Sequence, residues 1–343
     1  MNPKKQCHCS YLLSGLLPQI GLHLLCVGLV LGPMDVLAQA PSTSQGFFDR
    51  AFSLDLRKEP ERPRNYILPP LISFVLPGFD QWAEGQQEAG FTYSSLGVTG
   101  LVVGSSAWYR FNNRGVRGAT EIEISDRDNE VRQYLLGVQL YSAAGSLSAY
   151  HSFRSAVRTR QAQGQFAFLS QEESVDEILK SPFRFSYLRR PTTYYPLLLG
   201  TAAVGAIWAG HKSLFTRNQF NFADAFYSGS FSYLAGTHEE ALFRGWMMPV
   251  LMESWKSPLW SNTATAAVFA AAHYSQSNKV PVFQFVAGWY LGYLTQKNNW
   301  TLSEAIFVHT WWDVIIFSGL YFVEARARPE SAILNLPPIT FSF

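Results

Sequence analysis

Six ionisable side chains in the C-terminal half of the chain fall into three short groups within strongly apolar stretches. They are Glu239, Glu240 and Arg244, then His273, then His309 and Asp313. A charged side chain at the centre of a membrane helix costs about 2.5 to 3.5 kcal/mol, so such groups usually line a polar cavity. Carboxylates and imidazoles that meet in one cavity can activate water or hold a metal ion. We therefore expect an active site inside a membrane.

The two carboxylates of the first group, Glu239 and Glu240, are expected to lie on different faces of one helix. Glu240 and Arg244 are four positions apart, a spacing that puts both side chains on one helix face and suits an ion pair. Glu239 is one position earlier, so its side chain points about 100° away around the helix. We expect Glu240 and Arg244 to neutralise each other and Glu239 to act on substrate or water.

The second and third groups add two imidazoles and another carboxylate. His273 ends an apolar run, and His309 and Asp313 lie four positions apart on a third apolar stretch. Each could serve only its own helix, His273 at a helix end and His309 with Asp313 as a buried hydrogen-bonded pair. Polar groups on separate membrane helices avoid lipid by converging, however, so we expect these side chains to meet Glu239.

The converged groups fit two kinds of hydrolytic site. Glu239, His273 and His309, together with Asp313, could hold a divalent metal such as zinc and leave a position open for water. Without a metal, Glu239 and His273 could act as a general base while His309 donates to a tetrahedral oxyanion. The residue types do not separate these alternatives. His238, just before the glutamates, is either a supporting group or an ordinary histidine at a helix start.

The composition indicates a membrane protein built from helices. The chain has 343 residues, of which 48% are hydrophobic, 15% aromatic and only 15% charged, which is poor in charge for soluble domains. The predicted fold is all-α, a multispanning transmembrane helical bundle with a polar active-site cavity. The candidate segments are 66–79, 91–109, 134–150, 193–210, 220–236, 241–255, 263–273, 280–295 and 302–323. Several are shorter than the roughly 20 residues that span a bilayer, so they must pack around a shared interior.

Local patterns predict how some segments pack and connect. Small residues such as Gly100, Gly137 and Gly145 let membrane helices approach closely. The charged stretches 110–132 and 154–190 are typical of solvated loops. Within the second, the run from Ser170 to Glu173 resembles a capping box that opens a short surface helix.

The first forty residues resemble a secretory signal. Lysines at positions 4 and 5 precede an apolar stretch, and Ala38-Gln39-Ala40 before Pro41 suits signal peptidase; an uncleaved anchor is the alternative. All three cysteines lie in this stretch, so cleavage would leave no thiol for chemistry. The chain then divides into the signal 1–40, an exported polar leader 41–65, accessory membrane helices with a basic loop 66–190, a catalytic membrane domain 191–325 and a tail 326–343.

Two other classes of function are less well supported. A net charge of +2, without a basic patch interleaved with aromatic residues, argues against a nucleic-acid partner. A transporter could use the ionisable groups as a proton or ion relay. It would predict broken helices in two related halves, and the sequence shows no internal repeat.

The three groups, taken in order, resemble the CPBP family of intramembrane proteases. They read Glu239-Glu240-Ala-Leu-Phe-Arg244-Gly245, Phe269-x-x-x-His273 and His309-x-x-x-Asp313, and the resemblance covers about residues 190 to 325. The family includes prenyl-CAAX endopeptidases and bacteriocin-processing or immunity proteins.

The resemblance implies an intramembrane endopeptidase acting on a peptide or membrane-protein substrate in contact with membrane lipid. With the signal, it places the chain in a bacterial inner membrane as a multi-pass protein whose N-terminus is exported. Glu239 and His273 would activate water, and His309 would stabilise the oxyanion or bind a metal. Glu240 and Arg244 would complete the first motif. A catalytically silent immunity- or scaffold-type protein on the same fold is the alternative.

The third motif departs from the family pattern, which often ends in Asn where this chain has Asp313. An ionised carboxylate cannot donate a hydrogen bond to an oxyanion. Asp313 would therefore be protonated, orient His309 or belong to a metal site.

Overall fold

The computed structural model describes residues 63–113, 121–169, 173–210, 222–274 and 279–323. Every regular element in these ranges is helical, which confirms the predicted all-α class. The predicted signal 1–40, the leader up to residue 62 and the tail 326–343 lie outside the described residues.

The described ranges contain the following helices. In chain order they are α3 (Leu68–Val75), α4 (Phe79–Ala83), α5 (Gln87–Asn113), α6 (Glu121–Gln161), α7 (Val175–Lys180), α8 (Pro191–Gly210), α9 (Phe222–Leu242), α10 (Met248–Trp255), α11 (Pro258–Ala272), α12 (Val282–Lys297) and α13 (Ser303–Val323). Two 3₁₀ turns, Ser181–Phe183 and Phe185–Arg189, follow α7, and a π-helical turn, Phe243–Met247, joins α9 to α10.

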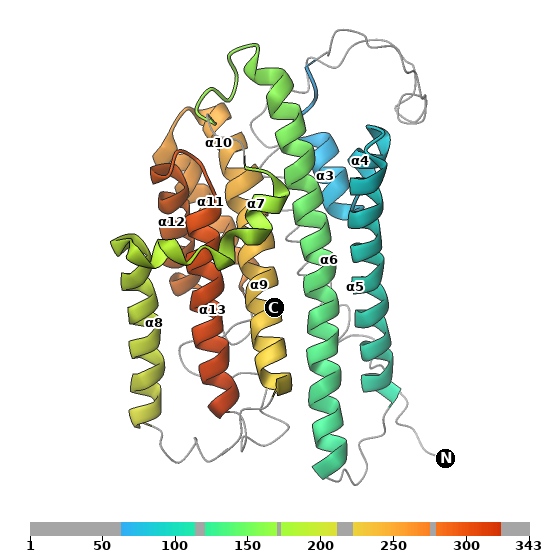
Figure 1. Cartoon of the computed structure of the whole chain (residues 1–343), viewed down its shortest axis with the longest axis vertical. Coiled ribbons are helices and arrows are strands. Elements are labelled where there is room, and N and C mark those ends of the chain that lie inside the picture. The colour runs from blue at the N-terminus through green and yellow to red at the C-terminus, as the bar shows by residue number, and fades with distance from the viewer. Residues whose placement is uncertain (1–62, 114–120, 170–172, 211–221, 275–278, 324–343) are drawn as a thin grey trace.

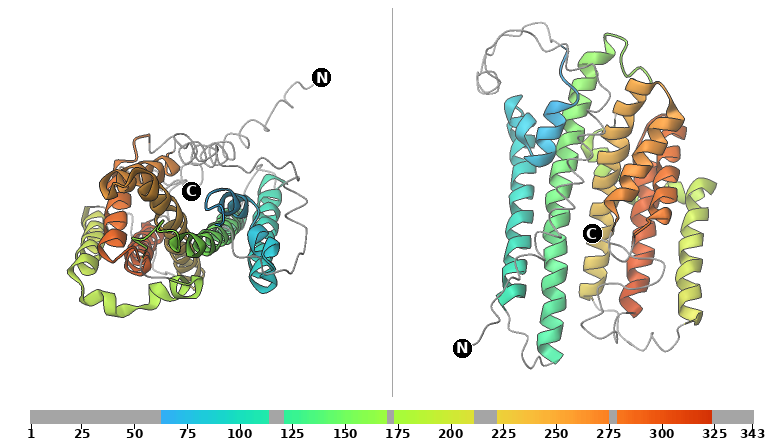
Figure 2. Two further views of the ribbon diagram at one scale, coloured as in Figure 1. Left: turned by 90° about the horizontal axis from the view of Figure 1, so that it is seen from above. Right: turned by 180° about the vertical axis from the view of Figure 1, so that it is seen from behind.

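The long helices run side by side along the long axis of the molecule. The antiparallel pair α5 and α6 forms one side, α9 and α13 pack together in the middle, and α8 packs against α13 (Figure 1). Helix α6 also packs against α9, which joins the pair to the rest of the bundle. Seen from behind, α5 and α8 lie at opposite edges (Figure 2).

Glycines permit the close contact between α5 and α6, as the sequence predicted. A Cβ atom on Gly137 would lie 2.3 Å from the backbone nitrogen of Gly104, and one on Gly100 would lie 2.6 Å from the carbonyl oxygen of Gly137. Any larger residue would push the backbones apart. The small residues therefore set the spacing of this helix pair.

Three predicted boundaries were wrong. Helix α6 begins at Glu121, so most of the stretch 110–132 that was expected to form a loop is helical. The same helix continues to Gln161, through the start of the second expected loop, because Phe153, Ala156 and Val157 recur at helical spacing and are buried in the core. The segments 220–236 and 241–255 are likewise not separate, because the π-helical turn carries the helix from α9 into α10.

In the part of the chain that the structure describes, none of the helices combines the length and the apolar character needed to cross a membrane.

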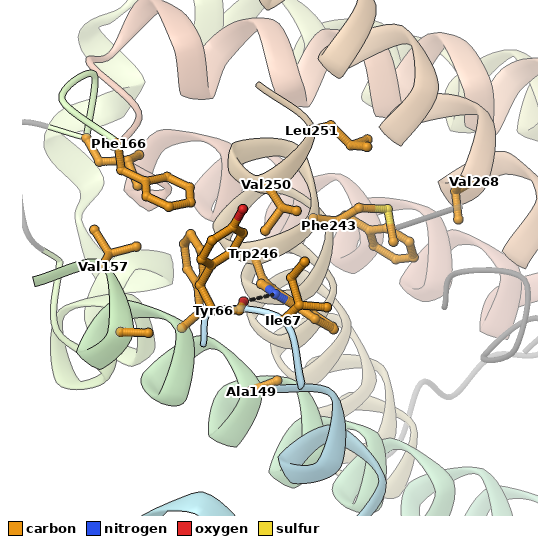
Figure 3. Close-up of a cluster of buried hydrophobic side chains, with 14 of the residues drawn as sticks. Tyr66, Ile67, Ala149, Val157, Phe166, Phe243, Trp246, Val250, Leu251 and Val268 are labelled. Carbon is orange, nitrogen blue, oxygen red and sulfur yellow. Dashed lines mark hydrogen bonds between the residues drawn. The ribbon is translucent and has the colours of Figure 1, made fainter. Parts of the chain in front are cut away.

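A hydrophobic cluster joins the N-terminal and C-terminal halves of the described chain. Tyr66, Val157 and Phe166 pack with Phe243 and Trp246 (Figure 3). The indole nitrogen of Trp246 donates a hydrogen bond to the carbonyl oxygen of Tyr66 at 3.3 Å. The core therefore includes residues on both sides of the domain boundary predicted at residue 190.

Residues 173–190, here called the crossing segment, run across the bundle from α7 to the start of α8 (Figure 1). The predicted short helix is present as α7, but the capping box consists of Ser174 and Glu177 rather than the earlier Ser170 and Glu173. The Ser174 hydroxyl accepts from the Glu177 amide at 3.2 Å, and the Glu177 carboxylate accepts from the Ser174 amide at 2.8 Å.

Glu173 caps a different helix, α13. Its buried carboxylate accepts hydrogen bonds from the backbone amide of Leu302 and from the backbone amide and hydroxyl of Ser303, the amide of Ser303 at 3.2 Å. Ser303 also bonds Ser181 at 2.9 Å and Arg184 at 3.2 Å. A carboxylate at a helix N-terminus satisfies unpaired amides and complements the helix dipole. The crossing segment therefore holds the start of the helix that carries His309.

We expect Glu173→Ala to lower the free energy of unfolding by about 1.5 to 3 kcal/mol, because it leaves buried amides without their charged acceptor. The measurement is thermal unfolding of the purified protein in detergent. Glu88→Ala is the control, since Glu88 lies exposed in the first turn of α5 and should change stability little. Equal melting temperatures for the two variants would contradict the capping role.

Candidate active site

The buried ion pair predicted at the first motif is present. Oε1 of Glu240 lies 2.8 Å from Nη1 of Arg244, and both side chains have 0% exposure. Arg244 also donates from Nη2 to the carbonyl oxygen of Gly288 on α12 at 2.7 Å. Its guanidinium lies 4.5 Å from the ring centroid of Phe269 on α11, a favourable cation–π distance. One arginine thus joins three helical segments.

Two glycines make room for this arginine and its turn. A Cβ atom on Gly288 would lie 3.0 Å from Nη2 of Arg244 and 2.8 Å from the Phe269 ring. Gly245, in the π-helical turn, lies against α6, where an added Cβ would meet the ring of Tyr150 at 2.6 Å. Close packing against Tyr150 therefore explains why the first motif ends in glycine. Single π turns of this kind are frequent at functional sites.

Glu240 also holds His309, a contact that the sequence analysis did not predict. Nδ1 of His309 lies 2.8 Å from the same Oε1 that binds Arg244. A carboxylate oxygen paired with an arginine accepts hydrogen bonds, so Nδ1 of His309 carries the hydrogen. Glu240 and His309 are 69 positions apart, and no local sequence pattern signals such a contact.

The side chain of Glu239 faces the imidazole rings of His273 and His309. Its Oε2 atom lies 3.9 Å from Nε2 of His273 and 3.8 Å from Nε2 of His309. This oxygen is buried and has no hydrogen-bond partner among the described residues. The distances are too long for direct hydrogen bonds and suit groups bridged by a water or a substrate atom. The expected convergence of Glu239, His273 and His309 is therefore present, while their catalytic roles stay predictions.

His273 has a defined tautomer in this arrangement. Its Nδ1 lies 2.8 Å from the carbonyl oxygen of Phe269, one turn earlier on α11. A carbonyl oxygen only accepts, so Nδ1 carries the hydrogen and Nε2 is the nitrogen that faces Glu239. The helix-end position of His273 thus orients the ring toward the site.

The three residues between His309 and Asp313 each contact a different segment. Thr310 packs directly against Gly236 of α9. A Cβ atom added to Gly236 would lie only 2.2 Å from the hydroxyl oxygen of Thr310. Trp311 donates to the carbonyl oxygen of Pro182 in the crossing segment at 2.8 Å, and Trp312 stacks on Phe283 of α12 at 5.5 Å. The motif thus packs α13 against three neighbouring segments.

The remaining two residues of that motif contact each other across one helical turn. Oδ2 of Asp313 lies 3.5 Å from Nε2 of His309. This is the i, i+4 pair that the sequence predicted, at a distance that is electrostatically close but longer than a strong hydrogen bond.

The predicted metal site does not fit the side chains as they stand. Among the described residues, no group of three or more His, Cys, Asp or Glu is arranged to hold a metal ion. Oε2 of Glu239 lies 3.9 Å from Nε2 of His273 and 3.8 Å from Nε2 of His309, whereas zinc bonds of about 2.0 to 2.2 Å would bring tetrahedral ligands closer together.

Comparison with known families supports a protease domain in this part of the chain. Residues 221–315 match the family model described as type II CAAX prenyl endopeptidase Rce1-like, which confirms the resemblance noted from the motifs. The matched segment contains all six of the predicted site residues. Neither the curated proteins nor the solved structures include a significant match.

We expect Glu240→Gln and Arg244→Ala each to reduce the free energy of unfolding by about 3 to 5 kcal/mol, because each leaves a buried charge without its partner. Thermal unfolding in detergent measures this effect. Lys180→Ala is the matched control, since the Asp176–Lys180 pair has the same i, i+4 spacing but side chains that are 68% and 66% exposed. An unchanged melting temperature with loss of activity would instead place the pair in the chemistry.

Proposed function

We propose that this chain, whose residues 221–315 form an Rce1-like domain of the CAAX protease family, is a membrane-embedded endopeptidase that activates water with Glu239 and His273. The observation that carries the proposal is the approach of Glu239 to two imidazoles from other helices, at 3.8 and 3.9 Å, where the three side chains are only 9 to 16% exposed. A protease acts on a peptide or protein substrate.

The geometry suits general-base catalysis. A water between Oε2 of Glu239 and Nε2 of His273 would lose a proton to Glu239 as its oxygen bonds to the carbonyl carbon of the substrate. The carbonyl oxygen then carries negative charge. When the C–N bond breaks, Glu239 returns the proton to the leaving amine, so atoms and charge balance.

His309 is the proposed oxyanion donor. Its Nδ1–H is engaged by Glu240, so the side that faces the site is Nε2, which lies near both Glu239 and Asp313. A doubly protonated ring would donate from Nε2 to the oxyanion, and the carboxylates of Glu240 and Asp313 would offset its charge. Asp313 acts in this scheme as a carboxylate partner of His309.

The distribution of polar and apolar side chains supports a location in the membrane. Charged groups such as Glu240 and Arg244 are fully buried, whereas large apolar side chains point outward from three helices. Those exposed side chains are Val98, Leu101 and Val102 on α5, Leu198 and Leu199 on α8, and Val282, Val286 and Trp289 on α12. Extended apolar surface of this kind favours a lipid or protein environment over water. We infer that these helices contact lipid and that the substrate reaches the site from the membrane.

We expect Glu239→Ala and His273→Ala each to lower turnover by about 10²-fold or more, because loss of a general base typically costs that much. Termini of membrane proteins compared between cells with wild type and with Glu239→Ala would identify substrates, and the purified protein would then be assayed on one of them. His151→Ala is the control, because His151 lies on α6 and contacts Tyr93 at 3.2 Å instead of the site. Full proteolysis by either purified site variant would refute the proposal.

Asp313→Asn tests the role of the third carboxylate. The amide keeps the shape but removes the charge that would offset a protonated His309, so we expect kcat to fall by about 10- to 100-fold, the loss typical when a hydrogen-bonding partner of a metal-bound histidine is removed. Steady-state kinetics across pH, with elemental analysis of bound metal in both proteins, provides the measurement. An Asn variant that remains fully active would identify residue 313 as a hydrogen-bond donor to the oxyanion.

A further inference from the structure

A buried hydrogen bond joins the accessory helix α6 to the residue next to Glu239. Nε2 of His238 on α9 lies 2.7 Å from Oε1 of Gln139 on α6. The two side chains belong to residues that are only 7% and 6% exposed. Gln139 lies outside residues 221–315, the part of the chain that matches the family model. This contact therefore brings a group from elsewhere in the chain to the catalytic helix.

The hydrogen bond fixes the orientation of the His238 ring. An amide oxygen only accepts, so Nε2 of His238 donates the hydrogen. Nδ1 of His238 is then an acceptor, and it is buried without a hydrogen-bond partner among the described residues. A buried polar side chain with one strong contact depends on that contact for its position.

The contact between Gln139 and His238 lies at the end of α9 that carries Glu239. A second polar contact between α6 and α9, the ion pair of Arg132 with Asp224 at 3.1 Å, lies near the start of α9. Asp224 precedes Glu239 by about four helical turns. Gln139 and His238, by contrast, form a polar contact between these helices directly beside Glu239.

We propose that Gln139 is a positioning residue for catalysis, which holds His238 and thereby sets the rotation of α9 that aims Glu239 at His273 and His309. The proposal rests on the proposed function of Glu239. Because Glu239 follows His238 directly, a rotation of α9 about its axis moves both side chains together. A displacement of about 1 Å at a catalytic group can reduce the rate by roughly 10²-fold.

The variant that tests this role is Gln139→Met, which keeps the length of the side chain and removes the acceptor. We expect kcat to fall by about 10-fold or more with little change in KM, because the substrate contacts are unaltered while the catalytic carboxylate is misaligned. Gln81→Met is the matched control. Gln81 is also buried, and it bonds Ser148 on α6 at 2.6 and 3.1 Å instead of a residue of α9, so its loss should lower the melting temperature and leave kcat unchanged.

A double-mutant cycle separates positioning from general destabilisation. If Gln139 acts through His238, Gln139→Met should have no further effect on kcat in a His238→Leu background. Additive losses in kcat, or a kcat for Gln139→Met equal to that of wild type, would overturn the proposal while the role of Glu239 stood.

A measurement without substrate keeps this inference separate from the proposed function. Nitrogen-15 spectra of the histidine rings should show Nε2 of His238 protonated in the wild type. In Gln139→Met, but not in Gln81→Met, the ring signals of His273 and His309 should shift. Unmoved ring signals would overturn the positioning role even if no substrate were cleaved. Shifted signals with no Glu239-dependent cleavage would refute the protease and retain the coupling between α6 and the cluster.

Discussion

The charge on Glu240 constrains the rest of the site, because it is buried without access to solvent. Its Oε1 atom lies 2.8 Å from both Arg244 and His309. Burial of an isolated carboxylate is very costly unless partners and hydrogen bonds compensate. The two partners come from the turn after α9 and from α13, so satisfying this charge fixes the relation of the two helices. Glu239, one residue earlier, is thereby directed toward His309.

The partners of that charge impose further packing requirements. Beyond Glu240, Arg244 contacts the carbonyl oxygen of Gly288 on α12 and the ring of Phe269 on α11. Both contacts require close approach, and Gly288 has no side chain that would block it. The same glycine pattern recurs at Gly236, where α9 meets α13. At these two positions, the absence of a side chain leaves room for a polar group of a neighbouring segment.

The region before residue 190 supports the site from the outside. Glu173 caps the start of α13, and Trp311 bonds Pro182 in the crossing segment. The core cluster also places Tyr66 against Trp246. The segment that resembles a protease family is therefore packed into a larger unit, and the contacts at its borders act on the two helices that carry Glu239 and His309.

The sequence by itself determined the all-helical class, the ion pair of Glu240 with Arg244, the spacing of His309 and Asp313, and the family resemblance, because each depends on helical periodicity or on short motifs. Only the tertiary structure decided that Glu240 also binds His309 and that Glu173 caps α13 rather than its own helix. These contacts join residues 69 and about 130 positions apart, and they depend on how buried charges find partners after the helices pack. Local sequence patterns therefore do not predict these long-range contacts.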